Sequence, residues 1–147
     1  MSCVLLADRH HQLIESVRDM LEADFSTLFI VADESSLAEG VARLRPRVVI
    51  VDLSLVSRRL PELLHQIRSS SPHTKLLLLS VHEQSSVARW ALEAGADGVV
   101  LTRSVAADLH PAIDTVMEDR SFVSPEIGLG HGAGDTQTTK NRRREGG

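Results

Sequence analysis

Polar side chains that could take part in chemistry follow several short apolar runs of this sequence. They carry two carboxylates, two guanidinium groups, imidazoles and hydroxyls, and they are Asp8, Arg9, His10, Asp52, Ser54, Ser80, His82, Thr102 and Arg103. The carboxyl ends of parallel strands meet at one edge of a sheet, and functional groups gather there. We therefore expect these side chains to converge on one polar site that mixes negative and positive charge.

The elements that must position these side chains follow from the apolar pattern. Short runs without helical spacing predict five strands, over residues 3–7, 28–32, 48–51, 76–79 and 99–101. Apolar residues at helical spacing predict five helices, over residues 13–21, 37–44, 60–67, 87–94 and 109–117. This strict alternation indicates an α/β fold, in which a parallel sheet is covered by helices on both faces.

Local signals refine these elements. Arg45 precedes a proline and should end the second helix, because a residue before proline avoids the α region. Gly95 is expected to cap the fourth helix at its carboxyl end. Residues 48–51 do not alternate in polarity, which predicts a central strand buried on both faces. Trp90 should lie at the margin of the buried stripe of its helix.

Four stretches at strand or helix ends resemble one known family. They are Val4-Leu-Leu-Ala-Asp8, Val48-Val-Ile-Val-Asp-Leu-Ser54, Leu76-Leu-Leu-Leu-Ser80 and Ala91-Leu-Glu-Ala-Gly-Ala-Asp-Gly98. Together they look like the receiver domain of bacterial two-component response regulators, in the subgroup that usually carries a helix-turn-helix output domain. Phe122-Val-Ser-Pro-Glu-Ile127 looks like the segment that closes that subgroup's receiver. The resemblance implies a flavodoxin-like, doubly wound sheet of five parallel strands in the order 2-1-3-4-5.

The resemblance also implies roles for single residues. A receiver takes a phosphoryl group from a sensor histidine kinase, and the matching phosphoacceptor is Asp52. Ser80 matches the hydroxyl that senses the phosphoryl group. Receivers bind Mg²⁺, and the matching ligands are Asp8, Asp52 and the backbone carbonyl of Ser54. Such hard oxygen ligands suit Mg²⁺, which retains several waters.

The sequence departs from the family pattern at three site positions. Arg9 replaces the second acid after the first strand, Thr102 replaces a lysine, and Val99 replaces an aromatic residue. A guanidinium can pair bidentately with a carboxylate. We therefore expect Arg9 to pair with Asp52 or Asp8 and to block Mg²⁺. In the alternative arrangement, Arg9 points to solvent and Arg103 takes the place of the lysine.

Simpler interpretations apply to the same residues. Asp52 could cap the following loop, and Asp8 could be the N-cap of the first helix. The histidines share no recognised metal-ligand spacing, so we expect them at the surface. The domain could also be a phosphorylation-independent dimerisation or docking module. A remote alternative is a cobalamin-binding domain, which Asp8-Arg9-His10 resembles, although Leu13 stands where that motif has glycine.

Composition limits the classes of function. The chain has 147 residues, a net charge of −4 and 3% aromatic residues, which disfavours nucleic-acid binding by this domain itself. The longest apolar runs are too short to cross a membrane. We expect a receiver over residues 1–127 and a flexible tail or truncated linker over residues 128–147. The expected protein is cytoplasmic, homodimeric and not an enzyme, and it would regulate transcription through an output domain outside this sequence.

Overall fold

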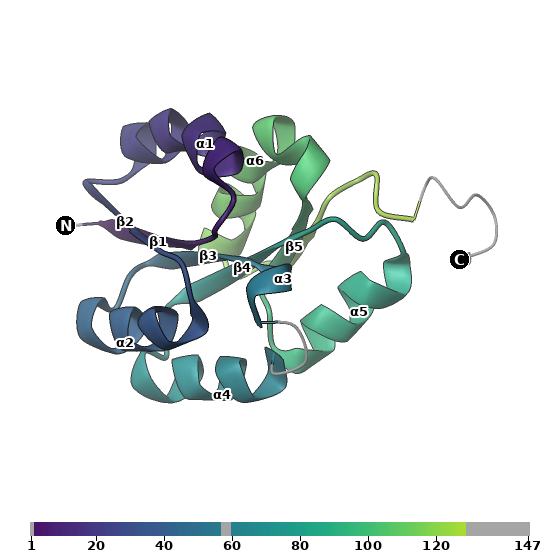
Figure 1. Ribbon diagram of the computed structural model, residues 1–147. Helices are drawn as coiled ribbons and strands as arrows, with labels where there is room; N and C mark the ends of the chain where they lie inside the picture. The colour runs from purple at the N-terminus through teal and green to yellow at the C-terminus, as the bar shows by residue number, and fades with distance from the viewer. Residues whose placement is uncertain (1, 57–59, 129–147) are drawn as a thin grey trace.

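The computed structural model describes residues 2–56 and 60–128 (Figure 1). The strands are β1 (Cys3–Ala7), β2 (Thr27–Val31), β3 (Val48–Asp52), β4 (Lys75–Ser80), β5 (Gly98–Leu101) and β6 (Phe122–Val123). The helices are α1 (His11–Asp24), α2 (Glu34–Leu44), α3 (Leu53–Val56), α4 (Leu60–Ser70), α5 (Ser85–Ala94) and α6 (Val105–Met117), with a 3-10 turn, η2 (Thr102–Ser104). The predicted alternation of strands and helices is confirmed, and the four-residue helix α3 is an addition to it.

The strands form one parallel sheet in the order β2-β1-β3-β4-β5-β6. The predicted order 2-1-3-4-5 is therefore confirmed, but the prediction of five strands missed β6, which pairs with β5. Gly98 lies opposite Phe122 in this pairing. A Cβ atom on Gly98 would lie 2.7 Å from Leu77 and 3.1 Å from the Phe122 carbonyl oxygen, so the close approach of β6 depends on this glycine.

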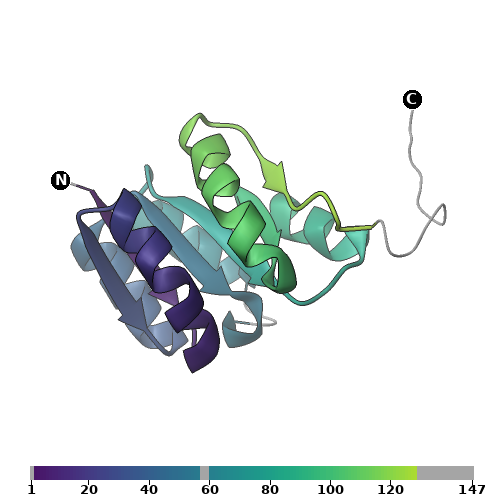
Figure 2. The same ribbon diagram turned by 90° about the horizontal axis from the view of Figure 1, so that it is seen from above.

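Helices cover both faces of the sheet, as Figures 1 and 2 show. The side chains of α1 and α6 pack in one core cluster with alternate residues of β1, β3, β4 and β5. The side chains of α2, α4 and α5 pack in a second cluster on the opposite face. All five residues of β3 are buried between the two layers, which confirms the prediction of a strand buried on both faces.

The two predicted helix ends are also confirmed. Arg45 follows the last residue of α2 in the left-handed conformation, with φ of 46°, so the helix cannot continue into Pro46. Gly95 follows α5 with φ of 118°, a conformation that glycine adopts without steric cost. These ends set the direction in which the chain enters β3 and β5.

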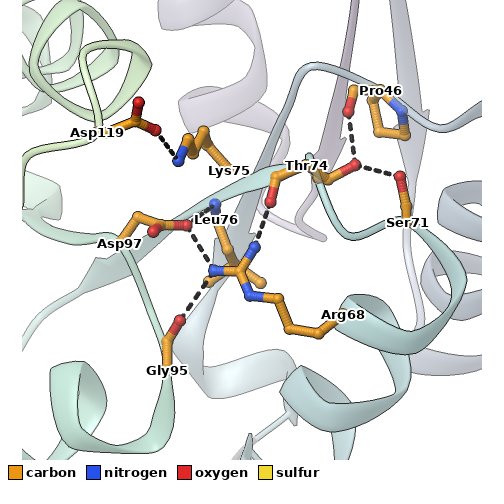
Figure 3. Close-up of polar contacts among 9 residues, drawn as sticks. All are labelled: Pro46, Arg68, Ser71, Thr74, Lys75, Leu76, Gly95, Asp97 and Asp119. Carbon is orange, nitrogen blue, oxygen red and sulfur yellow. Dashed lines mark hydrogen bonds and ion pairs between the residues drawn. The ribbon is translucent and has the colours of Figure 1, made fainter.

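The edge of the sheet at which β4 begins is held by a polar network around Arg68 (Figure 3). The Arg68 guanidinium donates to the Asp97 carboxylate at 2.6 Å, to the Gly95 carbonyl oxygen at 3.0 Å and to the Thr74 carbonyl oxygen. Asp97 also accepts the backbone N–H of Leu76 at 2.8 Å. Arg68 thereby ties the end of α4 to the loops that enter β4 and β5, at the edge opposite Asp52 and Ser80.

Within the two described ranges, 2–56 and 60–128, no helix is both long and apolar enough to cross a membrane. The predicted tail over residues 128–147 lies outside the described residues except for Gly128. The boundary between domain and tail therefore stays a prediction.

Candidate functional site

Asp8 directly follows β1, and Asp52 is the last residue of the neighbouring strand β3. Ala7 and Val51 are partners in the pairing of β1 with β3, so the next residue of each strand brings a carboxylate to the same edge. Asp8 is 1% exposed and Asp52 is 7% exposed. The predicted convergence of the two acids is confirmed, and each side chain is largely withdrawn from water.

The imidazole of His10 lies against both carboxylates. Its Nδ1 atom is 2.8 Å from Oδ1 of Asp8 and 3.0 Å from Oδ2 of Asp52. The backbone N–H of His10 also donates to Oδ1 of Asp8, at 2.7 Å. The hydrogen bond to Asp8 and the negative charge of Asp52 raise the pKa of His10. The three side chains therefore form one coupled cluster, in which the imidazole stands between two acids.

The expected pairing of Arg9 with Asp52 or Asp8 is corrected by this arrangement. Arg9 is exposed, and its charge acts on Asp33, whose pKa is lowered mainly by the backbone N–H of Ser36 and to a smaller extent by Arg9. The backbone between β1 and α1 is extended at His10. Side chains in extended backbone alternate in direction, so His10 lies on the side of Asp8 and Arg9 does not.

Asp52 is held in place by two hydrogen bonds from Ser54. The backbone N–H of Ser54 donates to Oδ1 of Asp52 at 3.1 Å, and the Ser54 hydroxyl donates to Oδ2 at 2.8 Å. Asp52 thus also caps the first turn of α3, as the simpler interpretation predicted. Asp8 does not cap α1, because the N-cap position is His10.

Of the other predicted site residues, Ser80 and Thr102 lie at this edge of the sheet, whereas Arg103 pairs with other residues. Ser80 is buried at the end of β4 and accepts the backbone N–H of His82 at 3.0 Å. Thr102 lines a cavity beside Asp52. Arg103 instead contacts Glu83 at 3.0 Å and Glu126 at 2.5 Å. The alternative arrangement is therefore confirmed for Arg9, which is exposed, and corrected for Arg103, which pairs with these two acids.

A cavity of about 730 Å³ opens beside Asp52. Its polar lining comes from His10, Asp52, Ser54, His82 and Thr102, and its apolar lining from Leu13, Leu53, Val81, Val87 and Trp90. Trp90 is 40% exposed, which confirms its place at the margin of the buried stripe of α5. The cavity gives solutes access to the Asp52 carboxylate. Trp90, the chain's one tryptophan, lies on its wall.

The cluster shares part of the Mg²⁺ site that the resemblance implies. The acidic pair of Asp8 and Asp52 is present, and one ligand atom from each of Asp8, His10 and Asp52 lies within 4.8 Å of the others. However, the third group is an imidazole nitrogen, while Mg²⁺ demands oxygen ligands in near-octahedral geometry. The cluster therefore offers two carboxylates but differs from the family's all-oxygen donor set by the imidazole that stands beside them. The Ser54 carbonyl as a ligand stays a prediction.

Sequence reasoning placed His10 at this edge of the sheet but missed its pairing with Asp8 and Asp52, which it assigned to Arg9. The six histidines in the described ranges are exposed, as predicted. The ring of His10 is nevertheless part of the site. The spacing of Asp8 and His10, two residues apart after a strand, was the available signal, since extended backbone places such residues on the same side.

Comparisons with known proteins agree with this fold. The family model described as response regulator receiver domain matches residues 4–114. The chain is 25% identical to the transcriptional regulatory protein DegU of Brevibacillus brevis over 126 residues, which cover 84% of this chain and 53% of that protein. It is 27% identical to a nitrate/nitrite response regulator protein homolog of Haemophilus influenzae, covering 84% of this chain and 61% of the relative. The chain thus spans between half and two thirds of the length of these relatives.

Solved structures give the same result. A two-component response regulator of the LuxR family from Aurantimonas sp. SI85-9A1 matches with a TM-score of 0.75 and 28% identity, over 86% of this chain and 92% of that chain. The RcsB response regulator of Salmonella typhimurium matches with a TM-score of 0.75 at 21% identity, over 94% of this chain and 71% of that chain, which supports the fold alone. Because the family model covers most of the described residues, the chain belongs to the response regulator receiver domain family.

Proposed function

We propose that this chain is an atypical receiver of a two-component system, which accepts a phosphoryl group on Asp52 from a sensor histidine kinase. The observation that carries this proposal is the position of Asp52, which ends the central strand β3 and lines an open cavity. In the transfer, a carboxylate oxygen of Asp52 bonds to phosphorus as the bond from phosphorus to the kinase histidine breaks. Ser80, at the end of the adjacent strand, is the hydroxyl proposed to sense the product.

The signal would leave the domain by protein contact. We propose that the domain forms a homodimer and acts in the cytoplasm. Both curated relatives are longer than the matched region, and the DegU relative is named as a transcriptional regulatory protein. By analogy, the receiver would control a transcriptional output outside residues 1–147, without itself binding nucleic acid.

A second candidate function is favoured by the bonds that Asp52 already makes. Its carboxylate accepts two hydrogen bonds from Ser54 and lies 3.0 Å from His10 Nδ1. A nucleophile whose lone pairs are bound in this way reacts slowly, because those bonds must weaken before attack. The second candidate is therefore a docking or dimerisation module that acts without phosphorylation.

Incubation with acetyl phosphate separates the two candidates. If Asp52 is the phosphoacceptor, intact mass spectrometry of the parent chain should record the mass gain of one phosphoryl group, and the Asp52→Asn variant should show none. Beryllofluoride, which mimics the phosphoryl group, should change the fluorescence of Trp90 in the parent chain only. Absence of both the mass gain and the fluorescence change would overturn the phosphoacceptor proposal in favour of the docking module.

A further inference from the structure

We propose that Asp8, His10 and Asp52 bind a first-row transition-metal ion such as Zn²⁺ through two carboxylates and one imidazole, in preference to Mg²⁺. This inference deepens the proposed function, on which its role in signalling rests. It concerns which ion the site takes, and that can be measured without any phosphoryl transfer.

The separations of the His10 ring from the two carboxylates suit a shared ion. The His10 Nδ1 atom is 2.8 Å from an Asp8 oxygen and 3.0 Å from an Asp52 oxygen. Two ligands at roughly 2.1 Å from a tetrahedrally coordinated Zn²⁺ ion lie about 3.4 Å apart, so each of these contacts would open by a few tenths of an ångström. A metal ion bound by neutral His10 would therefore need little movement of these side chains.

A second observation points to a missing positive partner. The Oδ2 atom of Asp8 is buried and has no hydrogen-bond partner among the described residues. The Asp8 side chain as a whole is fully buried. An unpaired buried carboxylate oxygen is costly, and an unseen ion is one of the ordinary explanations for such an atom. A metal ion in the cluster would satisfy it.

The donor set decides which ions are favoured. Imidazole nitrogen suits zinc, copper, iron and nickel, whereas Mg²⁺ is bound by carboxylates, carbonyls and water. Arg9, at the position where the family has its second acid, is exposed and adds no oxygen ligand. The chain has thus lost one carboxylate from the family set and brought one imidazole into the cluster, which shifts its preference from Mg²⁺ toward transition-metal ions.

Access and room for further ligands come from the cavity. His10 and Asp52 both line it, and the His10 side chain is 65% exposed. An ion can enter from solvent without opening the core. Water in the cavity can complete its coordination, as is usual at sites with three protein ligands.

The test is titration of the untagged chain with ZnCl₂ and MgCl₂ separately, followed by calorimetry and by amide NMR shifts. We expect one Zn²⁺ ion per chain, with shifts centred on residues 8–10 and 52–54, and an affinity at least tenfold above that for Mg²⁺. His10→Ala should lower the Zn²⁺ affinity by about tenfold or more. His11→Ala, at the neighbouring exposed histidine, should leave it unchanged.

Two results would overturn the proposal: Mg²⁺ binding as tight as that of Zn²⁺, or equal Zn²⁺ affinity in the parent chain and in His10→Ala. Circular dichroism checks that both variants fold, and Asp52→Asn gives a second way to weaken the site. The experiment is independent of the phosphoacceptor test. Metal binding as expected without any phosphorylation would remove the proposed function alone, and phosphorylation with no His10-dependent metal binding would remove this inference alone.

Discussion

The His10 imidazole lies 3.0 Å from the Asp52 carboxylate and thereby joins the loop after β1 to the end of β3. The same nitrogen contacts Asp8, so the two acids at the sheet edge are connected through one ring. A receiver with this cluster differs from the pattern that its family implies, because a side chain of the protein stands beside the predicted phosphoacceptor. We therefore expect the proposed reactivity of Asp52 to depend on its hydrogen-bond donors.

Removing the Ser54 hydroxyl should speed phosphorylation of Asp52. This hydroxyl donates to Oδ2 of Asp52 at 2.8 Å, and the bond must weaken when that oxygen attacks phosphorus. A hydrogen bond of this kind contributes about 1 kcal/mol, so its loss corresponds to a rate increase of roughly fivefold. The measurement is the initial rate of mass gain of Ser54→Ala with acetyl phosphate.

The matched control for this prediction is Ser54→Thr. Threonine keeps the hydroxyl, so its rate should stay near that of the parent chain. Ser54 is exposed, and neither substitution should lower the melting temperature by more than a few degrees. A slower reaction of Ser54→Ala would mean that the hydroxyl assists the transfer.

The Arg68 network should contribute more to stability than an exposed ion pair. Its guanidinium donates hydrogen bonds to Asp97 and to two backbone carbonyls (Figure 3). The side chains of Arg68 and Asp97 are each less than one-third exposed. Arg68→Met should lower the free energy of unfolding by about 1–3 kcal/mol, because Asp97 and the two carbonyls lose their donor. Arg120→Met removes an exposed pair with Glu118 and should cost less than about 1 kcal/mol. Urea denaturation measures the free energy of unfolding of both variants, and an equal loss in the two would contradict the larger contribution assigned to Arg68.

The link between α6 and α1 should make stability depend on pH. His110 Nδ1 is 2.8 Å from Asp24, and its other nitrogen faces Asp114 at 3.5 Å. The hydrogen bond to Asp24 and the charge of Asp114 raise the pKa of His110. A group whose pKa is higher in the folded state stabilises the fold fully at pH values below its unfolded-state pKa, about 6.5. This stabilisation is lost as the pH rises through the folded-state pKa.

Comparison with His110→Gln isolates this contribution, because His10 also has a raised pKa and titrates in both chains. The parent chain should exceed the variant in melting temperature at pH values below the unfolded pKa. The difference should shrink toward alkaline pH. A difference that is constant across this range would show that protonation of His110 is not involved.

Much of the fold was predictable because it depends on short-range patterns. The buried run of β3 and the helix ends at Arg45 and Gly95 follow from periodicity and local backbone preference, and all three are confirmed. Strand β6 was not predictable in this way. It has two residues, and it depends on the absence of a side chain at Gly98 on a neighbouring strand.

The site was predictable in position but not in its pairings. The carboxyl ends of β1 and β3 had to bring Asp8 and Asp52 together once the strand order was known. Which cation would meet them depended on the direction of two adjacent side chains, Arg9 and His10. That direction is set by the extended backbone before α1, which residue types alone do not specify.

The pairing of Arg103 with two acids predicts how the site communicates with the end of the domain. Arg103 contacts Glu83, in the loop after β4, and Glu126, near the last described residue. The Glu83 carbonyl oxygen also accepts the backbone N–H of Gly128 at 2.7 Å. The loop that follows Ser80 is thus bonded both to Arg103 and to the segment that leads out of the receiver.

Arg103→Ala should loosen this segment with little effect on global stability, because the three charged side chains are more than one-third exposed. Hydrogen exchange at the amide of Gly128 should become faster by severalfold, while amides of β3 keep their rates. Arg89→Ala, at an exposed arginine of α5, is the control and should change neither. Unchanged exchange at Gly128 in Arg103→Ala would mean that the backbone bond to Glu83 holds the segment without the arginine.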